Sequence, residues 1–186
     1  IKNDFLLFVG RFNKVKGIDI LLNAINLIKD SQEMEEKILV IMGVDFGFES
    51  EMYKMINNLK LQEKVLVIKN PPREDVISAY DDCKFLVLPS RWELSPLTPL
   101  EGFAFKKAVI STNTHGIPHV VKDRENGLLV EPEDYRSLAS AILQLLRNDR
   151  ECTQYGLAGY ELVQNICNSK KMARSTLEIY QHITNR

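Results

Sequence analysis

Residues 85–110 read FLVLPSRWELSPLTPLEGFAFKKAVI. This stretch begins with the apolar run Phe85–Leu88, ends with Ala108–Ile110, and holds a helix-length segment at roughly 97–106 between them. Neither run alternates apolar with polar residues, which is typical of strands that are covered on both faces in a parallel sheet. Two such strands joined by a helix predict a β-α-β unit with a right-handed crossover.

The same order of elements extends along the chain on both sides. Further apolar runs lie at 5–9, 38–42, 65–68 and, more weakly, 128–130. Between the earlier runs lie helical patterns, at 17–30, 50–60 and 73–82. We therefore predict an α/β fold with a doubly wound parallel sheet of about six strands, flanked by helices.

The last third of the sequence is helical. Asp134 precedes a segment with one apolar face and is predicted to cap that helix. Two more helices are predicted near 149–166 and 169–184, and the last carries an apolar stripe that includes Leu177 and Tyr180. Such a tail either packs on this domain or reaches a neighbouring one.

Composition excludes several classes of protein. With 24 Lys and Arg against 25 Asp and Glu, the net charge is −1, which argues against a nucleic-acid binder. No apolar run approaches the ~18 residues of a transmembrane helix. The 186 residues fit one domain, and a chain that opens Ile1-Lys2-Asn3-Asp4 is expected to be part of a longer protein.

Cysteine usage indicates a reducing compartment. The chain has three cysteines, Cys83, Cys152 and Cys167, and no Cys-x-x-Cys motif. An odd number without that spacing argues against a disulfide framework or a zinc site. Lone cysteines are usually small core residues.

Two cations follow the first predicted strand. Arg11 and Lys16 lie between Gly10 and Gly17, at the start of the next helix. Ligands of open α/β sheets bind at the carboxyl ends of the strands, and cations beside a helix start suit a phosphate. The alternative is a pair of solvated surface charges. The segment matches neither the Walker loop nor the dinucleotide fingerprint.

Two carboxylates, Glu93 and Glu101, follow the run at 85–88 with seven residues between them. The segment Thr98-Pro99-Leu100-Glu101 reads as a capping box with Pro99 at the first helical position, which would explain Glu101 without any ligand. Alternatively, both carboxylates accept hydrogen bonds from a hydroxyl-rich ligand such as a sugar. The amides of Leu97 and Thr98 would then face a phosphate, since the prolines beside them cannot donate.

No metal site is predicted. His115 and His119 are four residues apart, but Gly116 and Pro118 between them make a regular helix doubtful, and a third ligand at metal spacing is lacking. The sequence has no Asp-x-Asp motif that would hold Mg²⁺ or Mn²⁺ on a diphosphate.

In their order, these segments resemble the C-terminal domain of the family 4 nucleotide-sugar glycosyltransferases (glycosyl transferases group 1), which have the GT-B fold. The matching stretches cover nearly the whole chain: Val9-Gly10-Arg11…Lys16-Gly17, Leu88-Pro89-Ser90, Glu93 with Glu101, Gly116-Ile117-Pro118 and Asn126–Val130. The resemblance implies a Rossmann-like donor-binding domain over 1–186, one half of GT-B. The tail at 149–186 would pack back toward an N-terminal domain that is absent here and would expose an apolar patch.

The resemblance also implies roles for matching positions. Arg11 and Lys16, beside Gly10, would hold the donor diphosphate, and Glu93 would bind hydroxyls of the donor sugar; these three are the expected catalytic residues. Glu93 as a nucleophile is the alternative. Glu101 would bind the ribose hydroxyls of the nucleotide. The amides of Leu97 and Thr98 would lie near the phosphates or the sugar. The segments around Gly43 and Lys69-Asn70 would contact the base.

The implied activity is retaining and metal-independent transfer from a UDP-, GDP- or ADP-sugar, with no cofactor. The acceptor, a glycan or a lipid-linked molecule, would bind through the missing N-terminal domain, so this chain alone would bind donor weakly without turnover. The expected location is the cytoplasm, including peripheral association with the inner membrane face.

Several positions depart from the family pattern, namely Lys69, Leu94, Gly102-Phe103, Lys106 and His119. They leave the donor open, and His119 keeps a non-catalytic nucleotide- or sugar-binding module as an alternative. An epimerase of GT-B shape is a further alternative. A flavodoxin-like regulatory domain is disfavoured, because Arg11, Lys14 and Lys16 stand where that fold carries an acidic cluster.

Overall fold

A computed structural model describes residues 5–166 and 169–184. Its sheet has six parallel strands in the order β3-β2-β1-β4-β5-β6. The strands are β1 (Phe5–Val9), β2 (Ile38–Gly43), β3 (Val65–Lys69), β4 (Phe85–Leu88), β5 (Val109–Thr112) and β6 (Gly127–Val130). Each of them overlaps a predicted apolar run, so the predicted doubly wound sheet is confirmed.

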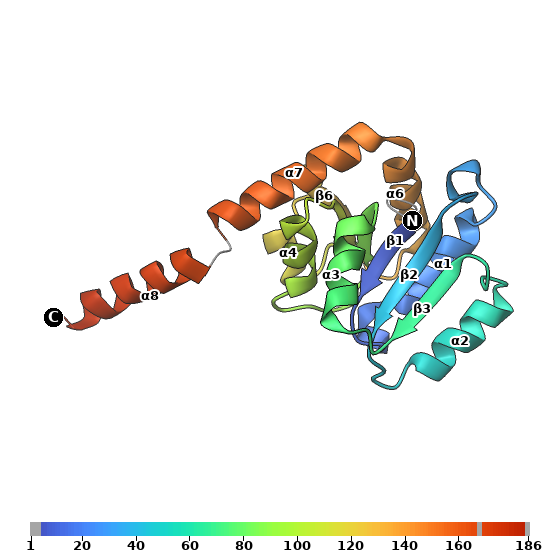
Figure 1. Ribbon diagram of the computed structural model, residues 1–186, viewed down its shortest axis with the longest axis horizontal. Coiled ribbons are helices and arrows are strands. Elements are labelled where there is room, and N and C mark those ends of the chain that lie inside the picture. Colours follow the sequence, from blue (N-terminus) through green and yellow to red (C-terminus); the bar gives the residue numbers. More distant parts are fainter. Residues whose placement is uncertain (1–4, 167–168, 185–186) are drawn as a thin grey trace.

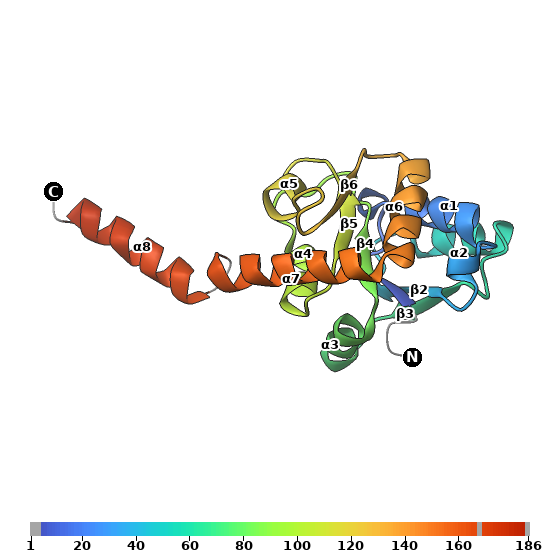
Figure 2. The same ribbon diagram turned by 90° about the horizontal axis from the view of Figure 1, so that it is seen from above.

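Helices cover both faces of the sheet (Figures 1 and 2). They are α1 (Ile18–Ile28), α2 (Glu49–Asn58), α3 (Arg73–Asp82), α4 (Leu97–Ala104), α5 (Ile117–Val120), α6 (Tyr135–Arg147), α7 (Asp149–Asn165) and α8 (Ser169–Thr184). The chain winds outward from β1 to β3 and then from β4 to β6. The return connection from β3 to β4 carries α3 in the direction opposite to that of α1. Right-handed crossovers, the general rule, place such helices on opposite faces, and Figure 2 shows α1 and α3 on opposite sides of the sheet.

The predicted burial of the strands on both faces is right for β1 and β4 and wrong for β3. β1 and β4 lie side by side at the centre of the sheet, and Leu6, Leu7, Phe85 and Leu86 have no exposed surface. β3 forms one end of the sheet, and Leu66 within it is 48% exposed. An edge strand has one neighbour, so an apolar run alone does not guarantee that both of its faces are covered.

The C-terminal helices differ in how they pack. Asp134 caps α6 as predicted, since its side chain accepts hydrogen bonds from the amides of Arg136 and Ser137. α7 packs on α4 and buries Cys152 and Tyr155. α8 extends away from the sheet and buries none of its residues; its exposed apolar side chains are Met172, Leu177, Ile179, Tyr180 and Ile183.

The predictions for the cysteines and for membrane-spanning segments can be compared with the structure only within residues 5–166 and 169–184. Cys83 and Cys152 are buried core residues, as expected, whereas Cys167 lies outside the described residues. In the ranges that the structure describes, no helix is both long and apolar enough to cross a bilayer.

Candidate functional site

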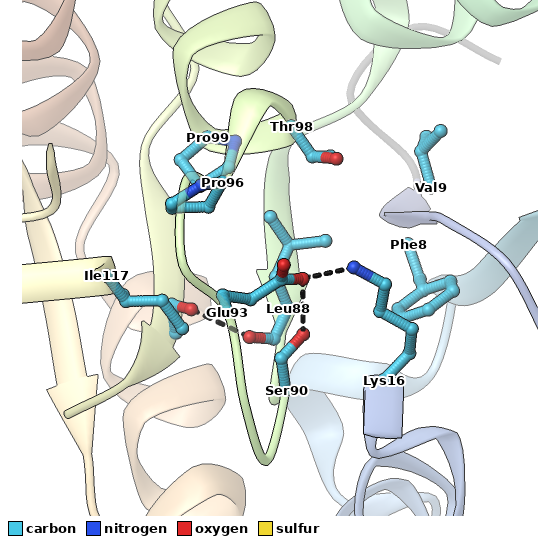
Figure 3. A pocket seen from close by; sticks show the side chains of 11 residues that line it. Phe8, Val9, Lys16, Leu88, Ser90, Glu93, Pro96, Thr98, Pro99 and Ile117 are labelled. Carbon is cyan, nitrogen blue, oxygen red and sulfur yellow. Dashed lines mark hydrogen bonds and ion pairs between the residues drawn. The ribbon is translucent and has the colours of Figure 1, made fainter. Parts of the chain in front are cut away.

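The carboxyl ends of β1, β4 and β5 meet at a small pocket (Figure 3). Its charged residues are Lys16, from the short 3₁₀ turn η1 (Lys14–Lys16), and Glu93, from the loop between β4 and α4. Ser90 and Thr98 line it as well, together with apolar groups of the strand ends. The structure thus brings three of the predicted site residues, Lys16, Glu93 and Thr98, into one place.

The local sequence explains why Lys16 points into this pocket. The Asn13 side chain accepts a hydrogen bond from the Lys16 amide and caps η1. The turn ends at Gly17, whose φ of 69° lies in the left-handed region that favours glycine. A Cβ on Gly17 would lie 1.9 Å from the carbonyl oxygen of Pro89, so only glycine lets η1 pack this closely on the loop after β4.

Lys16 and Glu93 form an ion pair across the pocket. The Ser90 hydroxyl donates a hydrogen bond of 3.2 Å to the same carboxylate oxygen, Oε1 of Glu93. Only 19% of the Lys16 side chain and 20% of the Glu93 side chain are exposed. The pocket that they help to line has a volume of about 10 Å³, roughly the space of one water molecule. The Lys16 ammonium that could bind a larger anion is thus already paired with Glu93.

Arg91 fixes the loop that carries Glu93. Its guanidinium forms a two-pronged pair with Asp19 of α1, at 2.8 and 2.9 Å, and also pairs with Glu133 and the Lys14 carbonyl. Burial alone would raise the pKa of Asp19, but the hydrogen bond and charge of Arg91 outweigh it and hold that pKa below its usual value. The same contacts raise the pKa of Arg91. One side chain thus joins η1, α1 and the loop before α6.

The predicted capping box at α4 is wrong. The helix begins at Leu97, with Pro96 as its N-cap and no side-chain cap, so Thr98 lies inside the first turn. Pro99 has no N–H, but this costs nothing within the first turn, and the helix therefore starts two residues earlier than that motif predicts. The amides of Leu97 and Thr98 belong to the group that a helix start leaves without intrahelical partners.

Glu101 is bound from outside its helix. The hydroxyl of Tyr80 on α3 donates a hydrogen bond of 2.7 Å to Glu101 Oε2. Glu101 therefore bonds to Tyr80 instead of capping its own helix. It lies on α4, the same helix that carries Thr98 in its first turn.

The predicted base-contacting segments form a row of backbone along the carboxyl edge of β1, β2 and β3. The Gly10 amide donates to Met42, and the Asn70 amide donates to Gly43. A Cβ on Gly43 would lie 1.8 Å from the Gly10 carbonyl oxygen, so this close approach needs glycine. The Lys69 side chain pairs with Glu49 at 2.7 Å, and the Lys69 backbone is the strand partner of Gly43.

Arg11 does not line the pocket that holds Lys16. It is exposed, and its guanidinium carbon lies 5.0 Å from the centre of the Phe46 ring. Sequence reasoning also missed Ser90, Arg91 and Tyr80. Ser90 stands in the Leu88-Pro89-Ser90 motif, so its proximity to Glu93 could have been inferred, whereas the partners of Arg91 and Tyr80 depend on helix packing.

No group of three or more His, Cys, Asp or Glu side chains within 5–166 and 169–184 is arranged to hold a metal ion. His115 has a different partner: its Nδ1 lies 2.6 Å from the Thr114 hydroxyl, and its ring meets Trp92 edge-on at 5.8 Å. Of the two histidines considered as a metal pair, His115 thus lies in the loop after β5 and His119 lies in α5.

Comparison of the sequence with known proteins finds a matching family. The family described as glycosyl transferases group 1 matches residues 2–162. An uncharacterized glycosyltransferase of Methanocaldococcus jannaschii is 31% identical over 188 residues, covering 97% of this chain and 49% of that protein.

Solved structures share the fold. Sucrose-phosphate synthase from Thermosynechococcus elongatus is 25% identical, with a TM-score of 0.87 over 98% of this chain and 46% of its own. HepE of Anabaena in complex with UDP is 18% identical, with a TM-score of 0.87 over 97% of this chain and 49% of its own. The predicted Rossmann-like fold, one half of GT-B, is confirmed. The chain spans about half the length of these three proteins.

Proposed function

The chain belongs to the glycosyl transferases group 1 family, and we propose that it is the donor-binding half of a glycosyltransferase. In this role it holds a nucleotide-diphosphate sugar while the sugar passes to an acceptor. The observation that carries the proposal is the convergence of Lys16, Glu93 and the start of α4 at the carboxyl edge of the sheet. This is the edge at which open α/β sheets bind ligands.

Each group in the pocket suits one part of such a donor. Transfer breaks the bond between the anomeric carbon and the diphosphate, so negative charge grows on the leaving group. In the proposal, Lys16 and the amides of Leu97 and Thr98 stabilise that charge, which is supported by Lys16 and Thr98 lining one pocket at the start of α4. Arg11 reaches the diphosphate by leaving the Phe46 ring. Glu93, released from Lys16, accepts hydrogen bonds from sugar hydroxyls.

The stereochemical and metal requirements are part of the same proposal. Fixed cations neutralise the leaving diphosphate without a metal ion. We propose retention of configuration with Glu93 as a sugar-binding group. The ribose hydroxyls meet Glu101, and the base lies against the backbone row of Gly10, Gly43 and Asn70.

The acceptor side of the reaction lies outside this chain in the proposal. A glycan or lipid-linked acceptor binds through an N-terminal domain that faces the carboxyl edge of the sheet. The exposed apolar face of α8 packs back toward that domain. The chain alone then binds donor without turnover.

The test is calorimetric titration of this chain with UDP, GDP and ADP, in buffer with EDTA. We expect one nucleoside diphosphate to bind, and at ten times its Kd to stabilise the fold by about 1.4 kcal/mol. For a domain of this size that corresponds to a melting shift of about 3–6 °C. Binding that requires a divalent metal would contradict metal independence, and no binding of any of the three would contradict the proposed donor site.

A further inference from the structure

Tyr80 is a buried tyrosine whose hydroxyl bonds to Glu101, the carboxylate proposed to meet the ribose. The residue lies on α3 and is 3% exposed. Its ring stacks on Phe105, with ring centres 5.7 Å apart and planes within 12° of parallel. This packing fixes the ring, and the hydroxyl donates its 2.7 Å hydrogen bond to Glu101 Oε2. A rigid donor is thus aimed at a carboxylate on the neighbouring helix.

Glu101 itself is exposed on α4. An exposed glutamate samples several rotamers, and ordering such a side chain on binding costs free energy. The Tyr80 hydroxyl selects one orientation before any ligand arrives. Within 5–166 and 169–184, the other oxygen, Oε1 of Glu101, has no hydrogen-bond partner. One oxygen is therefore tied to the core while the other stays available as an acceptor.

We infer that Tyr80 is a positioning residue for nucleotide recognition, because it holds Glu101 with one carboxylate oxygen free to accept hydrogen bonds from the ribose hydroxyls. The inference rests on the proposed function, since it concerns the same site. Tyr80 acts through Glu101 and does not touch the nucleotide.

The protonation state of Tyr80 agrees with this role. Burial, followed by the hydrogen bond and charge of Glu101, raises the pKa of its phenol. Tyr80 therefore remains a protonated hydrogen-bond donor at neutral pH. A lysine or histidine in this place would add a charge, whereas tyrosine orients the carboxylate and leaves its negative charge for the ligand.

Tyr155 provides a matched control. Its hydroxyl donates a 2.6 Å hydrogen bond to Glu151 Oε1, and the residue is 6% exposed, but both partners lie on α7 and neither lines the pocket. Tyr155→Phe deletes the same kind of contact as Tyr80→Phe at a place unrelated to the proposed ribose contact. Both variants keep the aromatic ring and its packing.

The experiment measures ribose discrimination. UDP, GDP and ADP are each titrated beside their 2′,3′-dideoxy analogues, and the ratio of the two Kd values is taken for wild type and variants. We expect the wild type to prefer the ribose form about tenfold, as for loss of a hydrogen bond to a charged group. Tyr80→Phe should cut that preference to about twofold, and Tyr155→Phe should leave it at the wild-type value. A general loss of fold would weaken both nucleotides together without changing the ratio.

Glu101→Gln completes the cycle. It should reduce the preference like Tyr80→Phe, and the double variant should lose little more than either single variant, since both act through one contact. A wild-type ratio in Tyr80→Phe would overturn the inference and leave the proposed function standing. A wild type without ribose preference would overturn the inference together with the proposed ribose contact of Glu101, and would leave the proposed donor site standing. A wild type that binds none of the three diphosphates would instead overturn the proposed function and this inference with it.

Discussion

Lys16 and Glu93 lie 77 residues apart in the sequence and form an ion pair at the carboxyl edge of the sheet. The cation suits a diphosphate and the carboxylate suits sugar hydroxyls. In this structure each of the two groups is bound to the other instead of to a donor. Each is about one-fifth exposed, and the pocket that they help to line has a volume of about 10 Å³. Donor binding in this account is therefore an exchange of partners rather than the filling of an open cleft.

The exchange predicts opposite effects of Glu93→Gln on the two parts of the donor. Without the carboxylate, Lys16 no longer has to leave a charged partner, and the affinity for the nucleoside diphosphate should rise up to about fivefold. The extra affinity that the sugar contributes should fall by about tenfold, because a neutral amide accepts more weakly. Calorimetry with the diphosphate and its sugar form measures both.

The control for this variant is Glu125→Gln, which changes an exposed glutamate on the loop before β6. It should alter neither affinity. A parallel loss of diphosphate and nucleotide-sugar binding in Glu93→Gln would contradict the exchange, since it would mean that Glu93 supports the phosphate site rather than competing for it.

The pair of Arg91 and Asp19 predicts a pH-dependent contribution to stability. Because Arg91 holds the pKa of Asp19 below its usual value, the unfolded chain binds more protons there than the folded one. The stabilisation is complete above the ordinary aspartate pKa of about 4 and is lost as the pH falls through the lower folded value. Asp19→Asn should thus destabilise the fold at pH 7 by about 1–3 kcal/mol and by less at pH 3.

Urea unfolding of wild type and Asp19→Asn at pH 7, 5 and 3 checks this. The Arg91→Met variant should show the same trend, because it removes the partner that lowers the Asp19 pKa. A destabilisation by Asp19→Asn that is constant from pH 7 to pH 3 would show that the pair does not shift the Asp19 titration.

Replacing Gly43 by alanine should disturb the backbone row formed by Gly10, Gly43 and Asn70 at the strand ends. Its Cβ would collide with the Gly10 carbonyl, a backbone atom that cannot swing aside. Gly43→Ala should lower the free energy of unfolding by about 1–3 kcal/mol. It should also speed hydrogen exchange of the Gly10 and Asn70 amides, which bond to the end of β2.

The contrast is Gly47→Ala, at a glycine whose Cβ would meet no atom within 4 Å. It strains the backbone locally, because Gly47 has a φ of 90°, but the Gly10 and Asn70 amides should keep their wild-type exchange rates. Unchanged exchange of both amides in Gly43→Ala would show that the strand ends tolerate a wider spacing.

The buried cysteines should be unreactive in the native protein. Burial raises the pKa of Cys83 to about 12 and that of Cys152 to about 11, and the thiolate is the reactive form. Peptide mapping after iodoacetamide treatment at pH 8 should find both residues unmodified until urea is added. Native modification of Cys83 at the rate of a free thiol would show that the C-terminal end of α3 opens readily.

The sequence predicted the sheet and half of the site for one physical reason. Continuous apolar runs identify strands, and parallel strands carry whatever follows them to one edge, so residues after β1 and β4 had to approach. Lys16 and Glu93 meet for that reason. The exposure of Leu66 was not predictable from its own run, because it depends on β3 being the edge strand.

Contacts made by helix packing were beyond sequence reasoning. The Tyr80 hydroxyl reaches Glu101 only because α3 and α4 cover the same face, and nothing in the local sequence of α3 marks that tyrosine. The same holds for Arg91, whose carboxylate partners come from α1 and from the loop before α6. The predicted helical segment at roughly 97–106 matches the start of α4 at Leu97, whereas the capping box was wrong because a cap and a helix interior use the same residue types at this spacing.

The central claim, that Lys16 binds the diphosphate of a nucleotide donor, is tested most directly by calorimetry with Lys16→Met. The control is Lys14→Met, which removes an exposed lysine two positions away that pairs with Asp19 and Glu51. We predict that the nucleoside diphosphate bound by the wild type binds Lys16→Met at least about tenfold more weakly and Lys14→Met with wild-type affinity. Equal affinity of Lys16→Met and wild type would contradict the account.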